Sequence, residues 1–135
     1  MPFEYKWDND DKTVVRYICG GVWKWNEFHR GVRVSHFAFD QNGHDKPIEA
    51  ILDLSKSVKM PAGAVGHLRS LNKMDHAKRT GRIVIIGADS ATQEQLGAKD
   101  GVFQTKDQLI RFVATDEEAQ QILTDWLRNS PAKES

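Results

Sequence analysis

The chain has 135 residues, of which 39% are hydrophobic and 28% are charged, as in an ordinary soluble domain with one core. Its 19 basic side chains balance its 19 acidic ones, so no net charge attracts nucleic acid or anionic lipid, and we expect neither as a partner. The single cysteine, Cys19, excludes an intrachain disulfide and a cysteine-based zinc cluster.

The sequence contains no apolar run that approaches the roughly 20 residues needed to cross a bilayer. Residues 1–12 lack the apolar centre of a signal peptide. We therefore expect a cytoplasmic protein without a transmembrane segment. Residues 1–128 are expected to form one domain, and residues 129–135 a disordered tail.

The N-terminal third predicts a hairpin and a helix. Aromatic residues alternate with polar ones over residues 3–7, and a second β-like run, residues 12–23, follows a turn. In this second run Val15, Tyr17 and Cys19 share one face. Residues 26–43 then carry apolar side chains at helical spacing, with Asn26 as the N-cap and Gly43 as the end of the helix.

The middle of the chain alternates between buried strands and helices. Residues 48–54 are almost continuously apolar, which is typical of a strand covered on both faces. We expect a helix over residues 61–79 that begins at Pro61 and ends in basic residues. A second buried strand is predicted over residues 82–88.

The C-terminal third predicts a helix, a strand and a final helix. The first helix follows residue 89, with Ser90 and Gln93 at capping-box spacing and Gly97 as its end. A strand over residues 108–114 precedes a strongly amphipathic helix, which Thr115 and Glu118 cap. The whole order, β-β-α-β-α-β-α-β-α, predicts an α/β fold with a mixed, mostly parallel sheet, an N-terminal β-hairpin and four flanking helices.

Three segments of the chain match a known family. They are "GGVWKWNEF" at residues 20–28, "ILDLS" at residues 51–55, and "RIVIIGA" through "FVATDEEAQQIL" between residues 82 and 123. Over residues 3–128 the chain resembles the STAS domain, specifically the SpoIIAA-like proteins, which include bacterial anti-sigma-factor antagonists. The resemblance implies a bacterial, non-enzymatic regulatory or protein-binding module with the STAS fold.

The resemblance also implies where this chain departs from the family. The antagonists carry an Asp-Ser-Ser-Gly box at the helix start after "LDLS", and the partner kinase phosphorylates a serine of that box. Here Pro61, Ala62 and Gly63 occupy the Asp-Ser-Ser positions, so the phospho-acceptor hydroxyl is missing. We therefore expect no kinase switch at this box. Ser55 and Ser57 fall outside it, and we expect them to serve the loop.

We expect a partner protein to bind at the loop and helix start after the central strand. The candidate contacts are Asp53, Ser55, Ser57, Met60, Pro61, Ala62 and Gly63. Asp53 ends its strand at the edge where open α/β sheets bind ligands. Alternatively, its carboxylate accepts backbone N–H bonds and holds the following loop in place.

An alternative function is the binding of a small apolar, lipid-like ligand in a pocket beside the first helix, because STAS-like proteins resemble CRAL-TRIO lipid carriers in shape. The candidate lining residues are Trp23, Trp25, Phe28, His29, Val32 and His36. The same aromatic side chains would otherwise pack in the core, or form an exposed patch for a partner or a second copy of the chain.

Catalytic chemistry finds little support in the sequence. His29 and His36 share a helix face, but no carboxylate stands beside them at the spacing of a metal site. Neither a G-x-S-x-G elbow nor a glycine-rich phosphate loop is present. An enzyme that uses Asp53 and a histidine is the last hypothesis, and we expect no catalytic residue, metal or cofactor. Homodimerisation through the sheet edge near Phe3–Trp7 is a further alternative.

Overall fold

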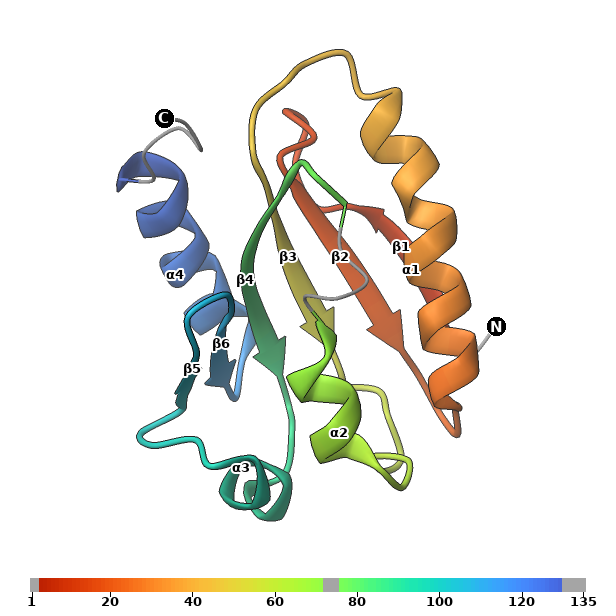
Figure 1. Cartoon of the computed structure of the whole chain (residues 1–135), viewed down its shortest axis with the longest axis vertical. Helices are drawn as coiled ribbons and strands as arrows, with labels where there is room; N and C mark the ends of the chain where they lie inside the picture. Colours follow the sequence, from red (N-terminus) through yellow and green to blue (C-terminus); the bar gives the residue numbers. More distant parts are fainter. Residues whose placement is uncertain (1–2, 72–75, 130–135) are drawn as a thin grey trace.

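The computed structural model describes residues 3–71 and 76–129, which form a six-stranded sheet and four α-helices (Figure 1). The strands are β1 (Phe3–Trp7), β2 (Val14–Cys19), β3 (Ile48–Asp53), β4 (Arg79–Ile86), β5 (Val102–Gln104) and β6 (Leu109–Val113). The helices are α1 (Trp25–Asp40), α2 (Ala64–Arg69), α3 (Ser90–Leu96) and α4 (Asp116–Asn129). The predicted α/β class is confirmed.

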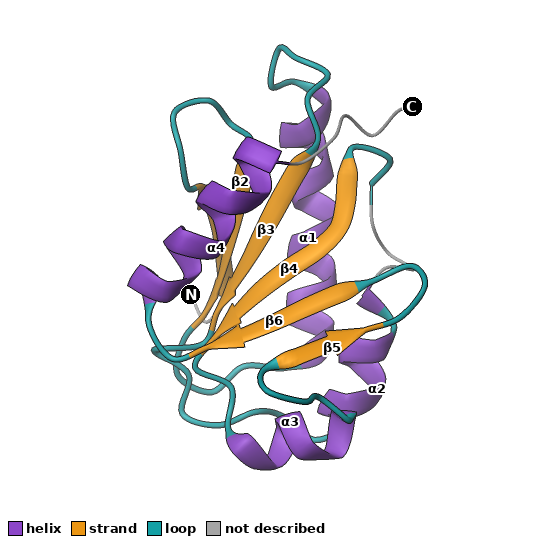
Figure 2. Cartoon of the chain, turned by 90° about the vertical axis from the view of Figure 1, so that its left-hand side faces the viewer, coloured by secondary structure: helices purple, strands orange, loops and turns teal. Residues whose placement is uncertain are grey.

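The sheet has the order β1-β2-β3-β4-β6-β5. Strands β2, β3, β4 and β6 are parallel, whereas β1 and β5 are antiparallel to their neighbours at the two edges. Because the parallel strands follow one another in order, right-handed crossovers place α1, α2 and α3 on one face. Helix α4 covers the other face, as Figure 2 shows. None of the described helices has the length and apolar character that crossing a membrane requires.

The sheet separates two hydrophobic layers. The larger layer, under α1, α2 and α3, contains Val15, Tyr17 and Cys19, so the predicted face of β2 is confirmed. The smaller layer, under α4, joins strand residues to Ala119 and Leu123. A strand interior that is covered on both sides explains the continuous apolar run of β3.

The bounds of α1 differ from the prediction. The helix begins at Trp25 after Lys24, whose backbone N–H donates to the Glu27 carboxylate at 2.8 Å. It ends at Asp40, before Gly43, which lies in a turn with a φ of +86°. Asn26 therefore lies inside the first turn, because the acidic side chain at the third helical position completes the cap.

The prediction of a long second helix from Pro61 is wrong. Gly63 has a left-handed φ of +85° and is the N-cap, so α2 starts only at Ala64 and ends at Arg69. Residues 72–75 of the expected helix lie outside the described residues. Strand β4 already begins at Arg79. The Lys78 ammonium, expected at the end of this helix, donates instead to the carbonyl of Phe39 at 2.7 Å, near the end of α1.

The C-terminal third contains a strand that the sequence did not predict, β5, which pairs with β6 through three residues. The cap of α3 is also one residue earlier than predicted, since the Asp89 carboxylate accepts the Thr92 backbone N–H at 2.7 Å. Gly97 ends α3 with a φ of +95°, as predicted.

The capping box of α4 is confirmed. The Glu118 N–H donates to Thr115 Oγ1, and the Thr115 N–H donates to Glu118 Oε1, each at 3.2 Å. Helix α4 continues through Asn129, the first residue of the expected tail, and the rest of that tail lies outside the described residues.

Candidate functional site

Asp53 holds the loop that follows β3. Its Oδ1 accepts the Ser55 backbone N–H at 2.9 Å and the Ser55 hydroxyl at 2.6 Å, and its Oδ2 accepts Arg16 Nη1 at 2.8 Å. Partial burial alone would raise the pKa of Asp53, but the hydrogen bonds from Ser55 and the nearby Arg16 outweigh it and lower the pKa. The geometry supports the loop-anchoring alternative, because the carboxylate stays ionised and is already engaged by these donors.

Arg16 lies at the centre of a wider ion-pair network. Its guanidinium, which is largely buried, also contacts the carboxylates of Asp8, at 2.7 Å, and Asp116. Gln120 of α4 donates to Asp8 at 2.9 Å. Burial opposes the charge on Arg16, but the hydrogen bonds to Asp116 and Asp8 prevail and raise its pKa. The network joins the sheet to α4. Because Asp53 is bonded to Arg16 in this network, its carboxylate is already occupied and is not free to contact a partner.

Two loops lie side by side at the carboxyl ends of β2 and β3. Gly21 N–H donates to the Lys56 carbonyl at 2.8 Å, and Val58 N–H donates to the Gly21 carbonyl at 2.9 Å. The hydroxyl of Ser57 accepts Trp23 Nε1 at 2.8 Å and donates to the Lys59 carbonyl at 3.1 Å. The loop role expected for Ser57 agrees with these bonds, which fix the shape of both segments.

Each of the two loops exposes a valine that lies within two residues of an exposed lysine. Val22 and Val58 are 73% and 70% exposed, and among residues 3–71 and 76–129 the only other large apolar side chain with a comparable exposed fraction is Phe37 of α1, at 69%. We name this set the Val22–Val58 surface, and its members are Val22, Lys24, Lys56, Val58 and Lys59.

The predicted apolar segment after Lys59 is only partly available. Met60 is half-buried and packs on the core, and the Pro61 carbonyl accepts Trp25 Nε1 at 3.3 Å. Ala62 and Gly63 are exposed. The large exposed apolar side chain of the loop is Val58, which the sequence did not reveal because a lone valine between lysines has no periodic pattern.

The aromatic residues predicted to line a pocket belong mostly to the core. Trp23, Trp25, Phe28 and Val32 are all buried. The rings of Trp23 and Trp25 lie 4.8 Å apart, and those of Trp25 and Phe28 lie 5.6 Å apart. These four residues therefore pack in the core, which was the alternative to a ligand pocket.

An open groove of about 400 Å³ does lie beside α1, but between this helix and β1. We name it the β1–α1 groove. Its lining residues are Phe3, Glu4, Tyr5, Glu27, Arg30, Gly31 and Val34, none of which is in the predicted ligand-binding set. The sequence did not reveal this groove because it forms only where β1 and α1, which β2 separates in the chain, come together.

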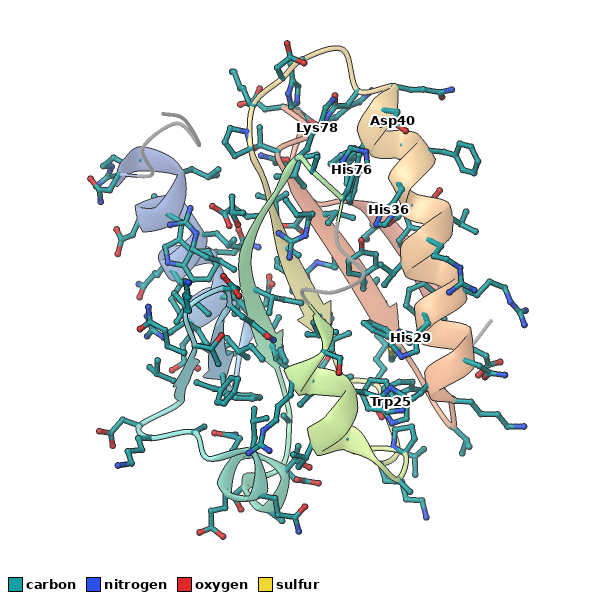
Figure 3. All side chains as sticks on the ribbon, viewed as in Figure 1. Trp25, His29, His36, Asp40, His76 and Lys78 are labelled. Atoms are coloured by element: carbon teal, nitrogen blue, oxygen red, sulfur yellow. The ribbon has the colours of Figure 1, made fainter. Side chains whose placement is uncertain are left out.

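The two predicted histidines of α1 lie in different surroundings. Figure 3 shows His29 beside Trp25 and His36 further along the helix, beside His76. His29 Nε2 lies 2.8 Å from His67 Nδ1, and burial, followed by His67, lowers the pKa of His29. The ring of His36 lies 5.4 Å from that of His76, which contacts Asp40 at 2.7 Å.

Across the described ranges no group of three or more His, Cys, Asp or Glu side chains could hold a metal ion. The Cys19 thiol is fully buried, and burial raises its pKa to about 12, so it stays protonated and inaccessible at neutral pH. A scan against models of protein families finds no match to this chain, and a search of curated proteins finds none either.

Proposed function

We propose that the protein is a non-enzymatic, regulatory protein-binding module of the STAS-like kind, and that it binds a partner protein through the Val22–Val58 surface. One observation carries the proposal: two loops distant in sequence, hydrogen-bonded to one another, present two of the three most exposed large apolar side chains of the described chain. Burial of these two side chains against a partner would remove apolar area from water, which favours association.

The backbone geometry makes the surface suited to binding. The hydrogen bonds of Gly21, Ser57 and Val58 hold the loops in one shape, so a partner would order few residues on binding. The three exposed lysines give the surface positive charge. A partner segment with acidic residues around an apolar centre would complement it.

The order of secondary structure supports the STAS-like part of the proposal. An N-terminal hairpin precedes alternating helices and strands, as the resemblance implies, although β5 adds an edge strand. The Val22–Val58 surface includes the loop after "ILDLS", next to the place where the resembling antagonists carry their phosphorylated box. In this chain apolar contact would replace a phosphate switch there.

The test compares partner capture from the protein's own cells by the wild type and by a Val22→Asp/Val58→Asp double variant. Leu127→Asp is the matched control, because Leu127 is also an exposed apolar residue, at 43%, but belongs to α4. We expect the same partner with the wild type and the control, and at least about tenfold less with the double variant, since each buried valine contributes roughly 1.5 kcal/mol. Equal capture by all three would contradict the proposal.

Gly63→Arg is a poorer test of this loop. A φ of +85° at Gly63 would strain any other residue, and a Cβ there would lie 3.5 Å from the His67 ring. Loss of binding in that variant would therefore mix backbone strain with loss of contact, whereas Val22 and Val58 point into solvent.

A small apolar ligand is the second proposal, and the β1–α1 groove is the observation in its favour. Native mass spectrometry of the protein purified from its own cells tests it. A bound mass on the monomer would support a ligand, and the mass of the bare chain alone would contradict one.

A further inference from the structure

Strand β1 forms a free edge of the described sheet. It pairs with β2 on one side only, and the Asp8 N–H donates to the Val14 carbonyl at 2.8 Å. Backbone groups of an antiparallel strand alternate in direction, so those of Phe3, Tyr5 and Trp7 face away from β2. This edge therefore carries a row of outward donors and acceptors along five residues, whereas the opposite edge strand, β5, has only three.

The β1–α1 groove runs along this edge. The Phe3 ring packs so closely on α1 that a Cβ on Gly31 would lie 1.8 Å from it, which brings helix and strand together. Val34, on the same groove, is 45% exposed. A further strand added beside β1 would lie along this groove and would contact the outer side of α1.

The charges of β1 are complementary to those of a second copy of β1. Glu4 and Lys6 are exposed and lie on the face of the strand opposite Phe3, Tyr5 and Trp7, which pack toward the core under α1. In an antiparallel pair centred on Tyr5, Glu4 of each copy stands opposite Lys6 of the other. A shift by two residues in either direction places Glu4 opposite Glu4, or Lys6 opposite Lys6, which is destabilising.

We propose that the protein forms a two-fold symmetric homodimer through antiparallel β1–β1 pairing centred on Tyr5. The backbone N–H of each Tyr5 donates to the Tyr5 carbonyl of the other copy, and the two six-stranded sheets become continuous. Both α1 helices then lie on the same face of the joined sheet, and their Val34 side chains approach one another across the axis. This interface is separate from the Val22–Val58 surface.

Sedimentation equilibrium of the full chain tests the proposal by charge exchange. We expect Lys6→Glu and Glu4→Lys each to raise the dimer Kd about tenfold or more, because each places like charges opposite one another at both ends of the pair. The double variant Glu4→Lys/Lys6→Glu should dimerise as the wild type does. An equimolar mixture of the two single variants should form heterodimers, which native mass spectrometry can count.

Lys106→Glu is the matched control, since Lys106 is exposed beside β5 at the other edge of the sheet and the change in charge is the same. Circular dichroism confirms that each variant is folded. A wild type that stays monomeric at every concentration would overturn the proposal. So would a dimer that the single variants do not weaken, or a groove occupied by a small apolar molecule on the monomer.

Discussion

Replacing Arg16 by methionine should destabilise the protein by about 3–5 kcal/mol, the usual cost of removing one partner from a buried ion pair. Methionine keeps most of the side-chain length but leaves three carboxylates without their common cation. Asp8 and Asp53 have side chains that are only 13% and 16% exposed, so water cannot replace the guanidinium well. Asp116 is 60% exposed and is rehydrated, so it adds little to the cost.

Urea denaturation measures this effect. A domain of this length has a free energy of unfolding of roughly 7–20 kcal/mol, so the variant should remain folded. With a slope of about 2 kcal/mol per molar urea, the midpoint should fall on the order of 2 M. Asp116→Asn is the matched control and should cost less than about 1 kcal/mol.

Lowering the pH should reduce the difference in free energy of unfolding between Arg16→Met and the wild type. The pKa of Asp53 is lowered in the folded wild type, so its contribution to stability is present above the unfolded pKa and is lost as the pH falls through the folded one. In the variant, protonation relieves the repulsion among the carboxylates instead. A cost below about 1 kcal/mol for Arg16→Met at neutral pH, or an equal cost for Asp116→Asn, would refute the role of this network.

Three further predictions concern the packing of α1 and β2. Gly31→Ala should destabilise the protein because the added Cβ would overlap the Phe3 ring. In a Phe3→Ala background the same change should stabilise the protein by up to about 1 kcal/mol, because alanine has the higher helix propensity. Stabilisation by Gly31→Ala with Phe3 present would disprove the contact. Burial lowers the pKa of His29, so as the pH falls this side chain takes up a proton in the unfolded chain before it does in the folded one. The wild type should therefore lose stability when the pH is lowered below about 6.5, and His29→Gln should lose less. Melting curves at pH 7.5 and 5.5 measure both losses, and equal losses would contradict the prediction. Cys19 should react with a thiol reagent at pH 8 only after unfolding, and rapid labelling of the native protein would show that the thiol is accessible.

The fold was predictable where a pattern extends over many residues. The continuous apolar run of β3 and the box of Thr115 and Glu118 led to correct elements. The prediction missed β5 because three residues are too short for a period. It started α2 too early because the left-handed backbone of Gly63 leaves no mark in the composition around it. Both are local conformations that tertiary contacts select.

The candidate site was predictable only in its location. The sequence placed the candidate contacts in the loop after β3, because apolar strands of a parallel sheet end at one edge. The sequence could not show that the Val58 N–H donates to the Gly21 carbonyl. Nor could it show that the Asp53 carboxylate accepts a hydrogen bond from Arg16. The contact between His29 and His67 likewise joins side chains on two helices that are 38 residues apart in the sequence. Pairings of this kind depend on the strand order and not on spacing.

Hydrogen exchange of the full chain, measured alone and with the captured partner, tests the proposed docking function most directly. If the loops after β2 and β3 form the contact, the partner should slow amide exchange in residues 20–24 and 55–60, and α4 should exchange as it does in the protein alone. Protection confined to α4 or to β5, with those loops unchanged, would contradict the proposed function.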